Sequence, residues 1–229
     1  MNSLQEKTIK AIVNIFETSH ILPQYGAIHV DVNEPGIISF GCIQFCLSAG
    51  SLYELLKRYL AKGERVVFSE LLDFLERVRQ RDITLAHDKL FISTLIASSI
   101  DPLMQEAQES FVTDMYWDPA MKRARYVNVS SPLACCIIYD SSVQGSFGKI
   151  AEVVQRDMRG LIATFKDEIV WMEKYCTTRK EWLYSRSNPL VRQSAYRPRE
   201  LLNLVREQQW NLDLPLRIHG VTITKELLS

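Results

Sequence analysis

The sequence lacks net charge, long hydrophobic runs and a secretory leader, and each absence excludes a class of function. Its 27 basic residues balance 27 acidic ones, so no overall positive field attracts nucleic acid, and we expect no nucleic-acid partner. No segment approaches the roughly 18 apolar residues of a membrane-spanning helix, which argues against membrane insertion. The first residues do not show a basic segment followed by an apolar one, so we predict no Sec signal peptide.

Metal-binding spacing is also missing. The five cysteines are odd in number and lie mostly in apolar runs, which predicts buried free thiols instead of disulfides. His29 has no second histidine at useful spacing, so we expect a structural or solvent-facing role for it. We therefore predict neither a metal nor a cofactor.

The length and composition are those of a globular protein with a large core. The chain has 229 residues, 47% hydrophobic and 24% charged, and needs no metal or disulfide to fold. No repeat or long linker divides it. We predict one domain over residues 1–229 with two lobes, and a cleft between the 1–48 region and the helical remainder.

Hydrophobic periodicity predicts a mainly α protein with one small β-hairpin. A first helix over residues 4–17 ends near Glu17. Short β-branched runs at 27–32 and 36–40 flank a turn of Asn33, Glu34 and Pro35. Most of the rest has helical spacing, and the predicted helices cover residues 50–62, 68–80, 88–98, 101–116, 118–125, 131–143, 147–162, 163–176, 178–186 and 198–209.

Several residue types along these helices have a structural interpretation. The helix over 131–143 is apolar on every side until Asp140, as expected of a central buried helix. The basic run from Arg179 to Arg199 fits a solvated helical face as well as a surface for wall phosphates or carboxylates. The tryptophans have helical spacing among leucine and isoleucine, so we expect core positions and not sugar ligands for them; they are Trp117, Trp171, Trp182 and Trp210.

The carboxylates near the N-terminus have the arrangement that a glycosidase needs. Hydrolysis of a glycosidic bond uses one carboxyl group as the proton donor and a second, ionised one to activate water. Glu17 follows two apolar residues at a helix end, whereas Asp31 and Glu34 lie in or beside a solvated turn. From position alone, a surface residue at a frayed helix end is the more common interpretation of Glu17.

Short segments in a shared order resemble glycoside hydrolase family 46, the chitosanases of the lysozyme-like superfamily. One of them, Met-Tyr-Trp-Asp-Pro-Ala at 115–120, is similar to the family's Tyr-Tyr-Phe-Asp-Pro-Ala. The matching segments are residues 11–17, 36–46, 48–55, 115–120 and 211–216. The resemblance implies a bilobal, mainly α (α+β) lysozyme-like fold with a small β-hairpin beside the active-site cleft.

The resemblance also implies roles for individual residues. Glu17 occupies the place of the family's catalytic acid, at the end of the first helix. The family's general base is an Asp five residues before a hydroxyl residue that holds the attacking water. Ser39 at the hydroxyl position makes Glu34 the base, while alignment on the hairpin glycine makes Asp31 the nearest Asp. The implied mechanism is inverting, with the two carboxyl groups roughly 6.5–9.5 Å apart.

A buried Arg-Asp-Arg network supports the catalytic acid in this family, and Asp140 matches its Asp. A buried carboxylate needs cationic partners on physical grounds as well, because burying it alone costs several kcal/mol. We expect Arg186 and Arg199 to be those partners, with Arg197 a close alternative.

Two departures from the family pattern bear on the substrate. Chitosanases carry an Asp after Gly50 that binds the amino group of glucosamine, and this chain has Ser51. The family's Gly-Asp-Gly-Arg-Gly hairpin is replaced by residues 33–37, Asn-Glu-Pro-Gly-Ile. Because a neutral hydroxyl holds an ammonium group weakly, we predict peptidoglycan as the substrate and muramidase activity, with chitosan as the alternative.

That prediction also suggests where the protein acts and with what. A muramidase of this kind fits an antibacterial effector with an immunity protein or delivery partner, or a phage endolysin. It would act in the periplasm or outside the cell after non-Sec delivery, or as a domain of a larger secreted protein. A third alternative is a non-catalytic wall-binding or interaction module on the same fold.

Overall fold

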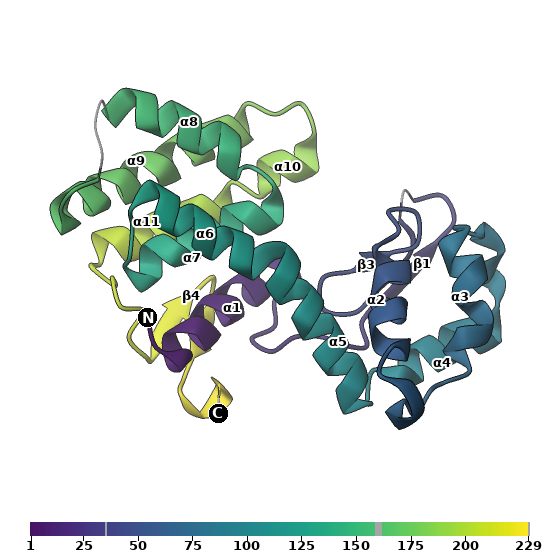
Figure 1. Cartoon of the computed structure of the whole chain (residues 1–229). Coiled ribbons are helices and arrows are strands. Elements are labelled where there is room, and N and C mark those ends of the chain that lie inside the picture. The colour runs from purple at the N-terminus through teal and green to yellow at the C-terminus, as the bar shows by residue number, and fades with distance from the viewer. Residues whose placement is uncertain (35, 159–161, 229) are drawn as a thin grey trace. The chain divides into compact units, whose positions relative to one another are not determined.

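The computed structural model describes residues 1–34, 36–158 and 162–228. Pro35 of the predicted turn and residues 159–161 of the predicted helix 147–162 lie outside the described residues. The chain forms two compact units, and Figure 1 shows that each unit contains several helices. Unit 1 comprises Met1–Leu22 and Tyr116–Ser229, and unit 2 comprises Pro23–Met115. No helix in the described ranges combines the length and apolar character that crossing a membrane requires.

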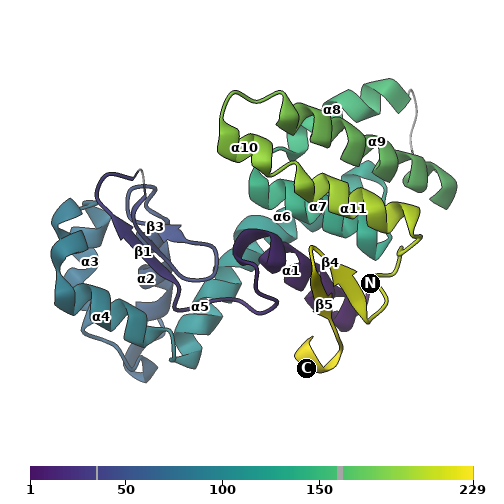
Figure 2. The ribbon, with the colours of Figure 1, turned by 180° about the vertical axis from the view of Figure 1, so that it is seen from behind.

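Unit 1 is a helical assembly around one central buried helix, α7 (Pro132–Gln144). Every residue from 131 to 141 is buried, and α1, α6 and α9 pack against α7. Figure 2 shows α9 and α11 running side by side. The other elements are α1 (Ser3–Thr18), α6 (Asp118–Val127), α8 (Phe147–Met158), α9 (Phe165–Tyr184), α10 (Pro189–Gln193), α11 (Tyr196–Arg206), β4 (Leu216–Ile218), β5 (Val221–Ile223) and a 3-10 turn (Glu226–Leu228).

Helix α1 has clear physical limits at both ends. Asn2 caps its start, because the Asn2 side chain accepts from the backbone of Gln5 while the Gln5 side chain accepts from Asn2. Its apolar residues face the core of unit 1. The helix stops at Ser19, which adopts a left-handed conformation with φ 63° and donates its N–H to Ile15. Glu17 therefore lies in the last turn of α1.

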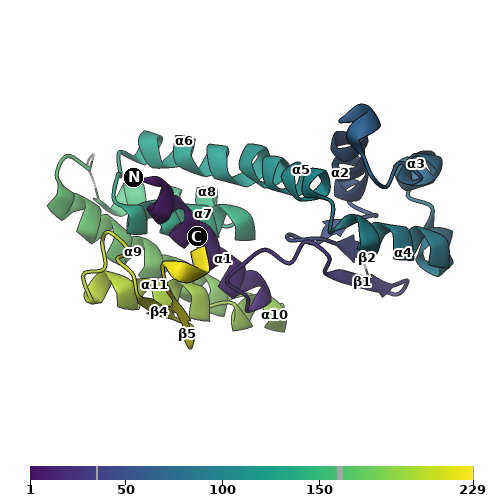
Figure 3. The same cartoon turned by 90° about the horizontal axis from the view of Figure 1, so that it is seen from below.

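Unit 2 combines a small antiparallel sheet with helices. The strand order is β1-β2-β3, and helix α2 packs against β3. Figure 3 shows β1 beside α4. Val30 of β1 and Ile96 of α4 line a pocket between these elements. The elements are β1 (Ile28–Asp31), β2 (Ile37–Phe40), β3 (Phe45–Cys46), α2 (Ser51–Leu60), 3-10 turns at Gly63–Arg65 and Ile83–His87, α3 (Leu71–Arg79), α4 (Lys89–Ser98), α5 (Pro102–Val112) and a π-helical turn (Thr113–Trp117) that continues into unit 1.

The predicted secondary structure is confirmed for the hairpin and for most helices. One boundary is wrong: residues 163–176 and 178–186 were expected to form two helices, and they form the single helix α9. The short helix α10 and the hairpin of β4 and β5 were not predicted. The division into units also differs from the expected boundary at residue 48, because α1 packs on α7 while the hairpin belongs to the α2–α5 unit.

Candidate active site

In unit 1, the site begins with Glu17 and the arginine that holds it. The Glu17 side chain is 37% exposed, and its Oε1 lies 2.7 Å from Nη1 of Arg197. The Arg197 side chain is only 6% exposed and also lies over the Phe16 ring, 5.4 Å from its centroid. Arg197 therefore reaches Glu17 from the protein interior, leaving the carboxylate open on its other side.

Behind Arg197, Asp140 joins two guanidinium groups at the centre of the unit. Nε and Nη2 of Arg197 donate to Asp140 Oδ1 at 2.9 and 2.6 Å, and Nη1 of Arg179 donates to Oδ2 at 2.5 Å. Asp140 and Arg179 are completely buried. Nε of Arg179 donates to Ser146 Oγ and Nη2 donates to Gln144 Oε1, so each of the three nitrogens of this buried cation has a partner. Together the four charged residues form a chain from Glu17 inward to Arg179.

In this network, the charged residues stabilise the ionised forms of their neighbours. Burial disfavours ionisation of Asp140, but the charges of Arg179 and Arg197 and their hydrogen bonds outweigh it and hold the Asp140 pKa below its ordinary value. Burial likewise disfavours the charged form of Arg197, while Asp140 and Glu17 raise its pKa. Removal of the Asp140 carboxylate would leave Arg179, which is completely buried, without a negative partner, which is the costly case for an internal ion pair.

The predicted network is thus present around Asp140, but two of its predicted members are wrong. Arg186 donates to the backbone carbonyl of Trp182 and stacks on the Trp182 ring, 4.5 Å from its centroid. Arg199 is largely exposed and lies 3.5 Å from Glu200. Neither is an ion-pair partner of Asp140, whose partners are Arg197, the stated alternative, and Arg179.

A signal for Arg179 was present in the sequence. The buried residues Met172, Cys176, Arg179 and Leu183 follow one face of α9 at spacings of four, three and four. Dividing this segment into two helices near residue 177 interrupted the stripe and assigned Arg179 to a solvated face. In the structure it is instead a core residue.

The end of α1 is also held by an aromatic cluster. The Tyr196 hydroxyl donates to the carbonyl of Phe16 at 2.8 Å, which satisfies a carbonyl in the last turn of the helix. His219 stacks on Tyr196 with ring centroids 4.3 Å apart, and both rings meet Phe16 edge-on. These contacts fix the backbone from which the Glu17 side chain extends.

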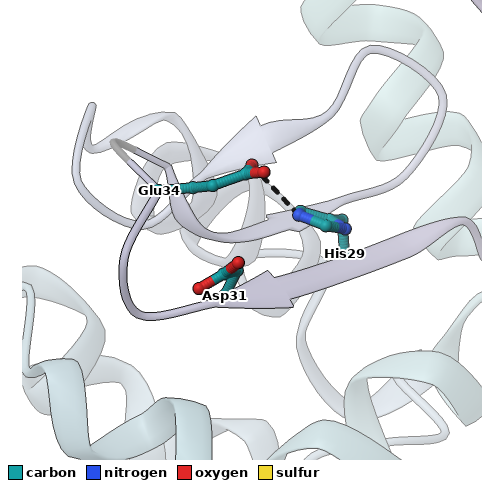
Figure 4. A group of neighbouring side chains, drawn as sticks. All are labelled: His29, Asp31 and Glu34. Atoms are coloured by element: carbon teal, nitrogen blue, oxygen red, sulfur yellow. Dashed lines mark hydrogen bonds and ion pairs between the residues drawn. The ribbon is translucent and has the colours of Figure 1, made fainter.

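In unit 2, the predicted carboxylates lie together on the hairpin. Figure 4 shows His29, Asp31 and Glu34 on one side of the ribbon, with Glu34 Oε2 3.0 Å from His29 Nε2. Asp31 Oδ1 accepts from the backbone and side-chain nitrogens of Asn33 at 2.8 and 3.1 Å, an Asx-type turn. The side chains of His29 and Glu34 are 55% and 57% exposed. Glu34 is therefore exposed and Asp31 is only partly exposed, and the two candidate bases have different partners.

These three residues also include the atoms that a metal ion could use. One ligand atom from each of His29, Asp31 and Glu34 lies within 4.8 Å of the other two. Exposed acidic groups of this kind are common in proteins without an ion, and the hydrogen bonds of Asp31 and Glu34 described above form without one. We therefore assign no metal to the group.

Ser39 lies on the same sheet, in a row that crosses all three strands. His29 of β1 pairs with Ser39 of β2, and Ser39 pairs with Cys46 of β3. Directly opposed side chains of antiparallel strands share a face. Ser39 Oγ lies 3.3 Å from Cys46 Sγ, and a Cβ at Gly36 would lie only 2.8 Å from Ser39 Oγ. The glycine therefore leaves room for the hydroxyl.

Ser51 does not offer a free group to a substrate. Its hydroxyl oxygen accepts from the Cys46 backbone N–H at 2.8 Å, which ties the start of α2 to strand β3. The residue has no charge and is only partly exposed. Its role in the fold is thus clear, whereas the predicted substrate contact stays a prediction.

The remaining expectations concern core residues. All five cysteines are free, and four of them are buried. Trp117 and Trp171 are buried, and Trp182 and Trp210 are partly buried against the same core. The core interpretation of the tryptophans is therefore confirmed.

Comparison with known proteins gives one consistent result. The family model for Glycosyl hydrolase family 46 matches residues 11–216. A chitosanase of Bacillus subtilis strain 168 is 22% identical over 232 aligned positions, covering 96% of this chain and 83% of the relative. The crystal structure of a chitosanase from Bacillus subtilis MY002 has a TM-score of 0.79 and 22% identity, covering 98% of this chain and all of that one.

A second solved structure agrees with the first. The Gynuella sunshinyii chitosanase in complex with chitotetraose has a TM-score of 0.80 and 23% identity, covering 97% of this chain and 98% of its own. The mainly helical, lysozyme-like fold is therefore confirmed. Since the family model spans most of the sequence, the chain belongs to glycosyl hydrolase family 46 and is a glycoside hydrolase.

Proposed function

We propose that the chain hydrolyses the β-1,4 bonds of chitosan, with Glu17 as the proton donor. The observation that carries this proposal is the buried chain of Arg197, Asp140 and Arg179 behind Glu17. A carboxylate at a frayed helix end would have no such support. Here a fully buried Asp orients the arginine that reaches it, which preorganises the group for chemistry.

The substrate follows from the relatives. The named relatives are chitosanases, and one solved structure holds chitotetraose. None of them supports peptidoglycan, the substrate that the sequence favoured. Chitosan is a polycation of glucosamine units, and the partly buried Asp31 and the exposed Glu34 carry the complementary charge.

The reaction uses two carboxyl groups in an inverting displacement. The oxygen of a water molecule forms a bond to the anomeric carbon as the bond to the glycosidic oxygen breaks. Glu17 gives its proton to that leaving oxygen. Glu34 takes the proton that the water loses, with Asp31 as the alternative base, and Ser39 accepts or donates a hydrogen bond to the water.

One observation favours a second candidate, peptidoglycan. The Ser51 hydroxyl is bound to the backbone of Cys46 and carries no charge, so an amino group finds no carboxylate at this position. An N-acetylated sugar has no charged amino group and therefore needs no carboxylate at this position. The two candidates therefore differ in whether a free amino group improves the substrate.

The proposal is tested by reducing-end release from soluble chitosan with the wild type, Glu17→Gln and Glu6→Gln. Glu6 is the matched control, because it lies on the same helix and its ion pair is with Lys10, outside the network of Arg197 and Asp140. We expect Glu17→Gln to lower kcat by at least about 100-fold, since general acid catalysis contributes about 10²–10⁴-fold. Glu6→Gln should keep wild-type turnover. Chitosan binding without turnover in the wild type would support the non-catalytic alternative instead.

A further inference from the structure

His29 occupies the position between the candidate base and the hydroxyl residue. Its Nε2 lies 3.0 Å from Glu34 Oε2, and its backbone is in register with Ser39 on the neighbouring strand. The residue thus contacts the base on one side and adjoins Ser39 on the other. Figure 4 shows the imidazole directed at the Glu34 carboxylate and not at Asp31.

The roles in this hydrogen bond follow from the two groups. An ionised carboxylate can only accept, so His29 donates its Nε2–H to Oε2 of Glu34. Within the described part of the chain, no hydrogen bond or ion pair involves the other oxygen of Glu34, Oε1, which can receive a proton from water. One oxygen is therefore anchored while the other is left for chemistry.

The length of the Glu34 side chain makes such an anchor useful. Where the family has Asp at this position, Glu34 adds a methylene and another torsion, and the side chain is 57% exposed. A longer exposed side chain visits more rotamers, and fixing it has an entropic cost when the reaction begins. A hydrogen bond already made in the resting protein removes part of that cost.

We propose that His29 is a positioning residue for Glu34, holding the longer side chain where it can deprotonate the water beside Ser39. This inference rests on the proposed function, with Glu34 as its base. It goes beyond that function because it states that a third residue, His29, determines that Glu34 and not Asp31 acts as the base. It also accounts for the exposed histidine that the sequence left without a specific role.

The test is steady-state hydrolysis of chitosan by variants of His29, alone and combined with Glu34→Asp. We expect His29→Ala to lower kcat about tenfold, the equivalent of one hydrogen bond, with KM changed less than about twofold. His29→Gln should recover most of the loss, because its amide nitrogen can donate from a similar place. His87→Ala is the control, an exposed histidine of the same unit.

The double variant separates positioning from a structural effect. Glu34→Asp shortens the side chain so that it no longer reaches His29, and adding His29→Ala should then change kcat less than about twofold. An equal loss in both backgrounds, or unchanged kcat in His29→Ala alone, would overturn the inference. Activity that survives Glu34→Gln but is lost in Asp31→Asn would overturn it too. A wild type without chitosan turnover would instead contradict the proposed function, before any His29 variant is compared.

Discussion

At the scale of single residues, Arg197 has the most demanding position in the molecule. It is almost fully buried, yet its guanidinium binds both the buried Asp140 and the half-exposed Glu17. A planar group with five donors can serve two carboxylates in this way, and a lysine could not. The orientation of Glu17 thus depends on a residue 180 positions later in the chain, which in turn depends on Asp140 and Arg179.

Asp140→Asn should therefore destabilise the protein strongly. The variant leaves two buried guanidinium groups without their shared carboxylate, and we expect the free energy of unfolding at pH 7 to fall by about 3–5 kcal/mol. Urea unfolding measures this loss. Asp213→Asn, at an exposed position of the same unit, is the control and should change stability by less than about 0.5 kcal/mol. A loss no larger than that of the control would contradict an ionised Asp140.

The difference in stability between the wild type and Asp140→Asn should depend on pH. The folded pKa of Asp140 lies below its ordinary value, because the two arginines outweigh the effect of burial. Its stabilisation is complete above the unfolded pKa of about 3.9 and is lost as pH falls below that value towards the folded pKa. The difference between wild type and Asp140→Asn should therefore shrink in acid below about pH 4. A constant difference down to pH 2 would show that charge is not its source.

Ser51 permits a second residue-scale prediction. Since its hydroxyl already serves the Cys46 backbone, Ser51→Ala should lower the free energy of unfolding by about 1 kcal/mol and leave KM for chitosan unchanged. Ser51→Asp should lower KM about two- to fivefold, the worth of an exposed ion pair with an amino group. A large rise of KM in Ser51→Ala would instead place the hydroxyl on the substrate.

At the scale of elements, both segments that carry the proposed chemistry have a residue with positive φ at one of their ends. Helix α1 stops at Ser19 with φ 63°, and strand β2 begins at Ile37 with φ 63°. This left-handed conformation favours glycine, and for a β-branched residue such as Ile37 it is uncommon. The resemblance places a glycine of the family's hairpin at the position of Ile37, so this chain adopts the left-handed conformation with a residue that disfavours it.

Ser19→Gly should stabilise the protein. Glycine reaches the left-handed region without a Cβ clash, and we expect the free energy of unfolding to rise by about 0.5–1 kcal/mol. Ser185→Gly is the matched control, because Ser185 caps α9 in a right-handed conformation with φ −77° and gains nothing from glycine. Thermal or urea unfolding of both variants measures the difference. Equal destabilisation in both would contradict the left-handed cap.

The elements show what could be predicted from the sequence and what could not. Local patterns located α1, the hairpin and most helices, since periodicity and turn residues act over short distances. The partners of Asp140 depend on packing between α7, α9 and α11, and no local pattern encodes such contacts. The burial of Arg179 did have a local signal in the spacing of α9, which the predicted break near residue 177 concealed, and β4 and β5 were missed because each is only three residues long.

At the scale of the whole molecule, the fold and the family agree while the substrate prediction does not. Ser51 stands where the family has an Asp, and this difference predicted peptidoglycan as the substrate. The named relatives instead favour chitosan. One substituted subsite residue is weak support for a new substrate, because binding of a long polymer is distributed over many contacts. The assignments to an endolysin or an antibacterial effector gain no support from these relatives either.

Reducing-end release from chitosan and from purified peptidoglycan, measured in parallel with the wild type and Glu17→Gln, tests the central claim most directly. We predict turnover of chitosan by the wild type, a kcat lowered about 100-fold or more in Glu17→Gln, and no turnover of peptidoglycan. Turnover of peptidoglycan alone, abolished by the same substitution, would contradict the proposed substrate while keeping Glu17 as the acid. Chitosan turnover that survives Glu17→Gln would contradict the assignment of the acid itself.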